Sequence, residues 1–211
     1  MNTAALGFRV HSGWTALIAV AVEKGKPIVL TRQRPHLVET FSYALRQPYH
    51  TAEKMSLDEA QEFLDGLRNV TRRLAVEALK SAQSDVAQQG YQVTQAALLT
   101  ASGRPLPELA KILAAHSLIH TADGEFFREA IMHGCRRQKL AVTAVKEREL
   151  MPAACLKLRR SRAALTGFLT KLGKPQGAPW TQDEKFATLA AWLALSRSGQ
   201  GSQGSRRRSG P

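Results

Sequence analysis

Residues 8–31 read FRVHSGWTALIAVAVEKGKPIVLT, and this stretch decides the class of fold. Val, Ile, Thr and Trp are frequent in its first part, and these side chains favour strands. We therefore expect a strand over 8–22, with a bulge near Gly13. A Lys-Gly-Lys-Pro turn over 24–27 leads into a second strand that ends at Thr31, so the two strands should form a hairpin. A third, weaker strand candidate follows over 36–41.

Helices and strands are expected to alternate in the rest of the chain. Residues 42–55 look irregular, and Ser56 and Glu59 then have the spacing of a capping box. The box opens a long helix that should end at Gly90, and a buried strand is expected over 93–100. The remaining expected elements are a short helix from Pro105 or Pro107, a helix from Thr121 to Gly134, a strand over 139–145, a helix over 152–172, and a helix opened by a second capping box at Thr181 and Glu184.

This order predicts an α/β fold with a mixed central sheet flanked by helices in three layers. Over about residues 7–172 the element order resembles the ribonuclease H-like fold. We expect an α/β domain over 1–172, a linker over 173–180, a C-terminal helix over 181–196 and a disordered basic tail over 197–211. The tail contains no core-forming residue. The runs around Val10–Trp14 and His116–Glu129 are also similar to an uncharacterised bacterial family.

Positive charge is concentrated in the C-terminal half. The 211 residues carry a net charge of +13, and residues 136–174 hold eleven Lys and Arg against two Glu. Such a segment attracts polyanions, of which nucleic acid is the commonest. The alternative is a solvated surface rich in arginine.

Several functional classes are disfavoured. No apolar run approaches the ~20 residues that a membrane helix needs, and the first residues lack the features of a signal peptide. Cys135 and Cys155 are the two cysteines, and neither lies in a CxxC pair, so reduced thiols in the cytoplasm are expected. A disulfide between them stays open. The Walker A and GxGxxG patterns are absent, and no cofactor is implied.

The ribonuclease H-like fold hosts nucleases, sugar kinases, actin-like ATPases and non-enzymatic translation modules, so it does not fix a function. The resemblance implies that a nuclease would hold two divalent cations on acidic residues at strand ends. The stretch 8–22 contains no Asp or Glu, and the strand over 93–100 ends without one. A two-metal nuclease site is therefore not expected.

Two groups of residues are candidates for chemistry. Ser102, Gly103 and Arg104 follow a buried strand, where α/β folds bind ligands, and they could contact a phosphate. The alternative is a simple turn. His116 and His120 are four residues apart, as are Glu125 and Glu129, and this spacing can place metal ligands on one helix face. The alternative is that these groups cap helices and form ion pairs.

The basic segment carries the favoured hypothesis. Lys157, Arg159 and Arg160 are expected on the polar side of the helix over 152–172, where they would bind anions. We predict a non-catalytic module that binds RNA or a ribonucleoprotein surface, with no membrane partner and an open oligomeric state. One alternative is a metal- or phosphate-dependent enzyme that uses the 102–104 loop and the 116–133 cluster. Another is a protein-interaction module in which the helix over 181–195 binds a partner.

Overall fold

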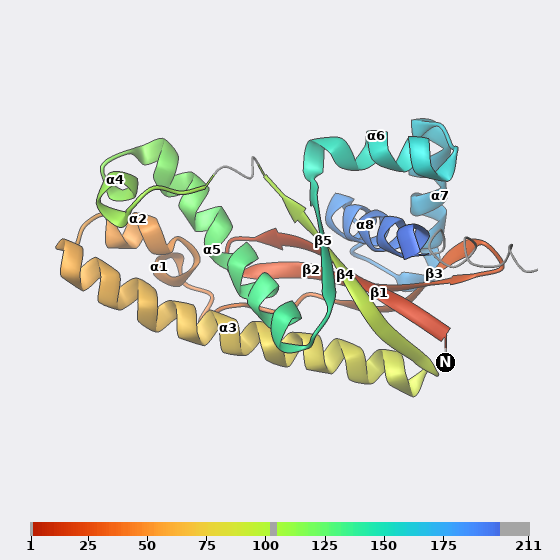
Figure 1. The fold of residues 1–211 in the computed structure, drawn as a ribbon, viewed down its shortest axis with the longest axis horizontal. Coiled ribbons are helices and arrows are strands. Elements are labelled where there is room, and N and C mark those ends of the chain that lie inside the picture. The colour runs from red at the N-terminus through yellow and green to blue at the C-terminus, as the bar shows by residue number, and fades with distance from the viewer. Residues whose placement is uncertain (1, 102–104, 199–211) are drawn as a thin grey trace, which may run out of the picture.

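The computed structural model describes residues 2–101 and 105–198. Its elements in chain order are β1 Asn2–His11, β2 Trp14–Glu23, β3 Lys26–Gln33, α1 Tyr43–Arg46, α2 Pro48–Ala52, α3 Leu57–Gln88, β4 Tyr91–Thr100, α4 Leu109–Leu113, α5 His116–Arg137, β5 Ala141–Lys146, α6 Glu147–Leu158, α7 Arg162–Leu172, the short 3₁₀ helix η1 Lys174–Gln176, and α8 Gln182–Ser198 (Figure 1).

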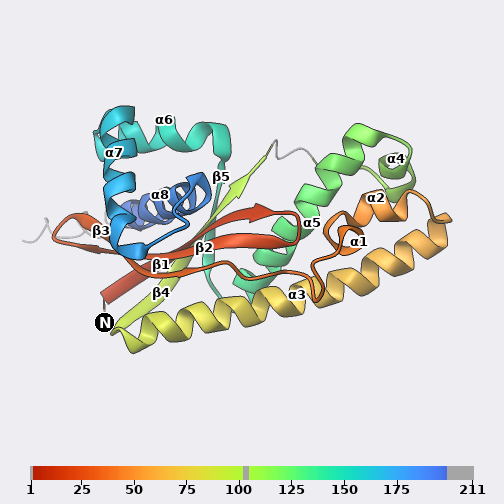
Figure 2. The ribbon, with the colours of Figure 1, turned by 180° about the vertical axis from the view of Figure 1, so that it is seen from behind.

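The five strands form one mixed sheet in the order β3-β2-β1-β4-β5. Strands β1, β2 and β3 are an antiparallel meander, and β4 pairs in parallel with both β1 and β5. Helices α3 and α5 cover one face of the sheet, and α6, α7 and α8 lie on the other (Figures 1 and 2). The mixed sheet between helical layers confirms the expected three-layer α/β architecture.

Alternation along the central strands divides the core in two. Leu6 and Phe8 of β1 pack towards α3 and α5, whereas their neighbour Ala5 belongs to the cluster under α8. Successive strand residues point to opposite faces, so a strand buried on both sides is apolar throughout. This is why 8–22 shows a nearly continuous apolar run.

Helix α8 lies unusually close to the sheet. A methyl group on Gly7 of β1 would stand 1.9 Å from the carbonyl oxygen of Ala187 in α8 and 3.1 Å from the side chain of Ala191. The alanines at 187, 190, 191 and 194 are all buried. Small residues on both elements therefore set the distance between helix and sheet.

The first strand prediction needs correction at Gly13. This residue adopts φ +82°, a left-handed conformation that glycine reaches without strain, and the chain turns back there instead of bulging. Residues 2–23 consequently form two paired strands. The third strand candidate at 36–41 contributes one bridge, between Trp14 and His36, and the stretch 42–55 contains α1 and α2 rather than irregular chain.

Two helix predictions also change. Helix α5 is continuous from His116, so Thr121 caps nothing, and its hydroxyl donates to the carbonyl oxygen of Ser117. The helix expected over 152–172 is broken at Arg159, which has φ +52°, and Ser161 caps the separate helix α7. The capping box of Ser56 and Glu59 is confirmed, as is the strand that ends at Thr100.

In the described ranges, no helix is both long and apolar enough to span a membrane. Cys135 and Cys155 are both free thiols. Nearly all of the tail predicted over 197–211 lies outside the described residues, and α8 ends at Ser198.

Candidate functional site: a histidine cluster beside a pocket lined by arginines

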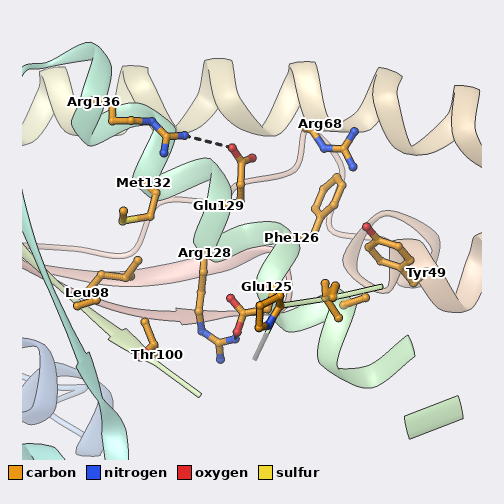
Figure 3. Close-up of a pocket in the computed structure, with 14 residues that line it drawn as sticks. Tyr49, Arg68, Leu98, Thr100, Glu125, Phe126, Arg128, Glu129, Met132 and Arg136 are labelled. Atoms are coloured by element: carbon orange, nitrogen blue, oxygen red, sulfur yellow. Dashed lines mark hydrogen bonds and ion pairs between the residues drawn. The ribbon is translucent and has the colours of Figure 1, made fainter. Parts of the chain in front are cut away.

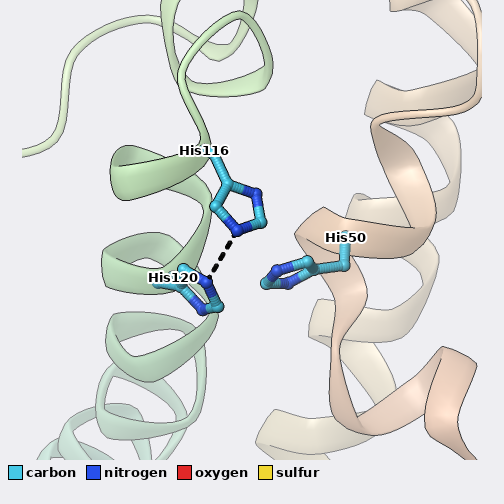
Figure 4. Close-up of side chains that lie close together, drawn as sticks. All are labelled: His50, His116 and His120. Carbon is cyan, nitrogen blue, oxygen red and sulfur yellow. Dashed lines mark hydrogen bonds between the residues drawn. The ribbon is translucent and has the colours of Figure 1, made fainter.

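Three histidines from two helices meet at one end of the molecule. His50 lies in α2, and His116 and His120 lie on the first turns of α5 (Figure 4). One ring nitrogen of each lies within 4.8 Å of the corresponding atom of the others. His116 and His120 are exposed and His50 is half-buried, so a metal ion held by the three rings would keep an open side towards solvent. We call these three residues the histidine cluster.

The spacing of the rings suits a tetrahedral metal. The Nε2 atoms of His116 and His120 are 3.1 Å apart. Two nitrogens bound to zinc at their usual distance and at a tetrahedral angle would be roughly 3.3 Å apart. The ring of His50 lies 4.6 Å from that of His120 and 5.4 Å from that of His116, between centroids. Only a small movement of the rings is needed for all three to share one ion.

A buried carboxylate orients His50. Nδ1 of His50 lies 2.5 Å from Oδ2 of Asp123, and Oδ1 of Asp123 accepts the backbone N–H of Tyr49 at 2.7 Å. Burial raises the pKa of Asp123, while the hydrogen bonds from Tyr49 and His50 act in the opposite direction. When Nδ1 donates to a carboxylate, the other ring nitrogen keeps its lone pair for a metal.

The structure separates the four residues predicted as metal ligands. His116 and His120 are joined by His50, which the sequence did not reveal because it lies in a different helix, 66 positions earlier than His116. Glu125 instead pairs with Arg128 at 2.9 Å. Glu129 is held by Arg72 of α3 at 2.8 Å and by Arg136 at 3.4 Å. Both glutamates are thus committed to arginines.

A pocket of about 490 Å³ opens on another face of α5, at the ends of β4 and β5. Leu98, Phe126 and Met132 form much of its apolar wall, and the side chains of Arg68, Arg128 and Arg136 also line it (Figure 3). We call this the arginine pocket. A second cavity of about 590 Å³ adjoins it and shares Thr100, Glu125 and Ala144 with it.

The predicted anion-binding residues fall in different places. Ser102, Gly103 and Arg104 lie outside the described residues, between Thr100 and Pro105, both of which line the arginine pocket. Lys157 lines the second cavity. Arg159 sits at the break between α6 and α7, and the guanidinium of Arg160 lies 5.3 Å from the ring centre of Phe168. The helix that was expected to carry all three residues is broken there, so Lys157 belongs to α6, whereas Arg159 and Arg160 lie between α6 and α7.

Carboxylates gather beside β1 although the strand has none of its own. Arg9 of β1 is bonded to Glu147 of α6 at 2.7 and 3.0 Å and to Asp183 of α8. Asp183 also contacts His11 at 3.0 Å, and Arg34 reaches both Asp183 and the buried Glu184. Strands β1 and β4 contain no Asp or Glu, yet Glu147 and Asp183 from the helices place carboxylates beside β1, which the sequence did not indicate.

No protein-family model matches the chain, and no curated protein matches it in sequence. Solved structures do match it. The structure titled T. thermophilus RuvC in complex with Holliday junction substrate is 12% identical, with a TM-score of 0.52 over 94% of this chain and 96% of that one. A second RuvC structure, from Thermus thermophilus, gives 12% and 0.53 over the same shares.

These matches correct the functional expectation from the sequence. The choice of a non-catalytic module rested on the basic segment over 136–174 and on the missing acidic residues of a two-metal site. The fold, however, matches over nearly the whole chain that of RuvC, which was solved with a Holliday junction substrate. The preference for a binding module over an enzyme is therefore wrong. The fold itself is confirmed: the chain has the ribonuclease H-like architecture of RuvC.

Proposed function

We propose that this protein is a metal-dependent hydrolase that cleaves phosphodiester bonds in nucleic acid, with zinc held by His50, His116 and His120. The histidine cluster is the observation that carries the proposal. Three protein ligands with a fourth position left for water are typical of catalytic zinc, and imidazole is a preferred ligand for this ion. The shared fold with RuvC, which was solved in complex with a Holliday junction substrate, supports nucleic acid as the substrate.

The chemistry needs only water. Zinc held by His50, His116 and His120 would act as a Lewis acid and would make water a strong nucleophile near neutral pH. In the hydrolysis, an oxygen from water would bond to phosphorus, the bond from phosphorus to one sugar oxygen would break, and that sugar oxygen would take up a proton. The products are a phosphomonoester and an alcohol, so no oxidant or reductant is required. Asp123 contributes by fixing the ring of His50.

Metal content is the first test. Zinc-loaded wild-type protein, after removal of free metal, is expected to retain about one zinc ion per chain by elemental mass spectrometry. His116→Ala and His120→Ala should lose it, and both residues are exposed, so the fold should survive. His36→Ala is the matched control, because His36 is an exposed histidine outside the histidine cluster. Wild-type protein without bound zinc would refute the site.

Activity is the second test. Zinc-loaded protein should hydrolyse bis(p-nitrophenyl) phosphate, a simple phosphodiester, and should cut a labelled four-way DNA junction. Chelation of zinc and the His116→Ala substitution should remove both activities, while His36→Ala keeps them. A protein that binds zinc stoichiometrically but cleaves neither substrate would overturn the proposed function and leave the metal site standing.

A further inference from the structure

We infer that the arginine pocket binds a nucleoside monophosphate unit, with the base against its apolar wall and the phosphate on its arginines. The inference adds to the proposed function and does not rest on the zinc site, because no member of the histidine cluster lines the pocket. The ligand could be a free nucleotide or one unit of a nucleic-acid strand, which share this chemistry.

The apolar half of the pocket has the size and character for a flat ring. The volume of the whole pocket, about 490 Å³, falls within the ~300–1,000 Å³ that is usual for small-molecule sites. Leu98 comes from β4, and Phe126 and Met132 from α5. The ring of Phe126 packs edge to face with Tyr49, at 6.2 Å between centroids. Phe126 and Leu98 are buried, and the guanidinium of Arg68 lies 5.6 Å from the centre of the Phe126 ring, so half-buried Met132 is the most accessible of the three for contact with a base by dispersion.

Arg128 and Arg136, on the charged side of the pocket, have hydrogen-bond donors that their carboxylate partners do not fully use. Arg72 donates two hydrogen bonds to Glu129, at 2.8 and 3.2 Å, and Arg136 adds a longer one at 3.4 Å. The single charge of Glu129 therefore does not balance both arginines, and one positive charge remains for a ligand. Nε of Arg128 is buried and has no hydrogen-bond partner among the described residues, although its Nη1 donates to Glu125. A buried donor without an acceptor costs about 1–3 kcal/mol. A phosphate in the pocket would supply an acceptor to this N–H once the Arg128 side chain turned towards it.

The electrostatic environment agrees with an anionic ligand. The pKa of His133, one position from Met132, is lowered by burial and by the positive charges of Arg72, Arg136 and Arg137, against the opposing charge of Glu129. Three of the four charged groups that act on His133 are arginines, and positive charge gathered in this way attracts phosphate.

The position in the fold points the same way. Thr100 ends β4, and Ala144 lies near the end of the parallel strand β5, so the pocket sits at the carboxyl ends of two parallel strands. This edge is where open α/β sheets bind their ligands. The second cavity, which adjoins the pocket at Thr100 and Ala144, is lined by Lys146 and Lys157 together with Glu125 and Glu149, so charged groups of both signs continue beyond the pocket.

Binding to metal-free protein tests the inference. Thymidine monophosphate, thymidine and inorganic phosphate are titrated into wild-type protein in the presence of a chelator, by calorimetry. The monophosphate should bind at least about tenfold more tightly than either half alone, because each half uses only part of the pocket. Equal affinity for inorganic phosphate would reduce the pocket to an unspecific anion site and overturn the inference, as would no binding at all.

Two pairs of variants locate the site. Arg136→Gln should weaken monophosphate binding by about tenfold, the scale of one charged hydrogen bond. Arg162→Gln, at an exposed arginine of α7 that does not line the pocket, should leave it unchanged. Ala144→Phe should fill the pocket and abolish binding, whereas Ala141→Phe places the same side chain at another exposed position of β5. Equal effects within either pair would place the nucleotide elsewhere.

The length of the ligand distinguishes a free nucleotide from one unit of a nucleic-acid strand. A thymidine pentanucleotide that binds more tightly than the monophosphate identifies a nucleic-acid strand as the ligand, and equal affinities identify a free nucleotide. Both results support the pocket. Because the titrations need no zinc, and the His116→Ala variant should give the same affinities, a failure here is separate from a failure of the proposed hydrolase.

Discussion

Asp123 is the residue on which the histidine cluster most depends. Its two oxygens bridge α5 to the backbone of Tyr49 and to the ring of His50, both in α2. We predict that Asp123→Asn lowers zinc affinity by roughly 10–100-fold, the usual effect of losing a carboxylate behind a histidine ligand. The amide oxygen can still accept from Tyr49, so circular dichroism should show a folded protein. Unchanged zinc affinity in competition titrations would mean that the carboxylate does not orient the ring.

Gly7 decides how closely the C-terminal helix approaches the sheet. A Cβ there would overlap the backbone of Ala187, and backbone cannot rotate aside as a side chain can. We predict that Gly7→Ala lowers the free energy of unfolding by at least about 2 kcal/mol, towards the upper end for overpacking, as measured by urea denaturation. Gly66→Ala in the exposed part of α3 is the control, since nothing lies near its Cβ, and alanine favours helices there. Similar losses in both would refute the packing argument.

Among the helices and strands, those that depend on short-range interactions were predicted correctly from the sequence. The capping box at Ser56 forms through hydrogen bonds between residues three positions apart, and it appears in the structure as expected. The apolar run that ends at Thr100 forms a strand buried on both faces, also as expected. The turn at Gly13 and the break at Arg159 depend on left-handed backbone conformations. The glycine at 13 indicated an irregularity in the strand but not a reversal of the chain, and an arginine gives no signal for a left-handed conformation at position 159.

Helix α8 is fixed to the sheet through its first turn, where Asp183 meets Arg9 and His11. Burial acts to raise the pKa of Asp183, but His11 and Arg9 outweigh it, and the pKa lies below its ordinary value. The carboxylate therefore stabilises the fold above the unfolded pKa of about 3.9. This contribution is lost as the pH falls through the lower folded pKa.

We accordingly predict that Asp183→Asn lowers the free energy of unfolding by about 2 kcal/mol at pH 7. The difference from wild type should shrink as the pH falls below about 4, because the unfolded carboxyl takes up its proton there while the folded one stays charged down to its lower pKa. Asp58→Asn, at an exposed carboxylate in the first turn of α3, is the control. A difference that is constant between pH 7 and pH 3 would show that the charge of Asp183 is not what matters.

At the scale of the whole molecule, the site depends on contacts that no sequence window contains. His116 and His120 could be paired from their spacing, but His50 joins them only because α2 packs against α5. The arginine pocket likewise combines Arg68 from α3 with Arg128 and Arg136 from α5 and with the end of β4. Helical periodicity identifies residues on one face of one helix, whereas tertiary packing determines which faces meet.

The net charge of +13 makes a prediction for the molecule as a whole. If nucleic acid is the substrate, each phosphate that the protein neutralises releases counterions, and log affinity falls linearly with log salt by about 0.9 per contact on duplex DNA. Lys157 and Arg159 lie at the end of α6, near the second cavity that Lys157 lines. We predict that the double substitution Lys157→Gln and Arg159→Gln weakens binding of a DNA junction and reduces the slope by up to about two units.

The control is the double substitution Lys24→Gln and Lys26→Gln, at the exposed turn between β2 and β3, which removes the same charge from another part of the surface. Fluorescence anisotropy at several salt concentrations measures both slopes. If the two double variants reduce the slope equally, the charge acts as a diffuse field, and the α6 end is not a contact surface.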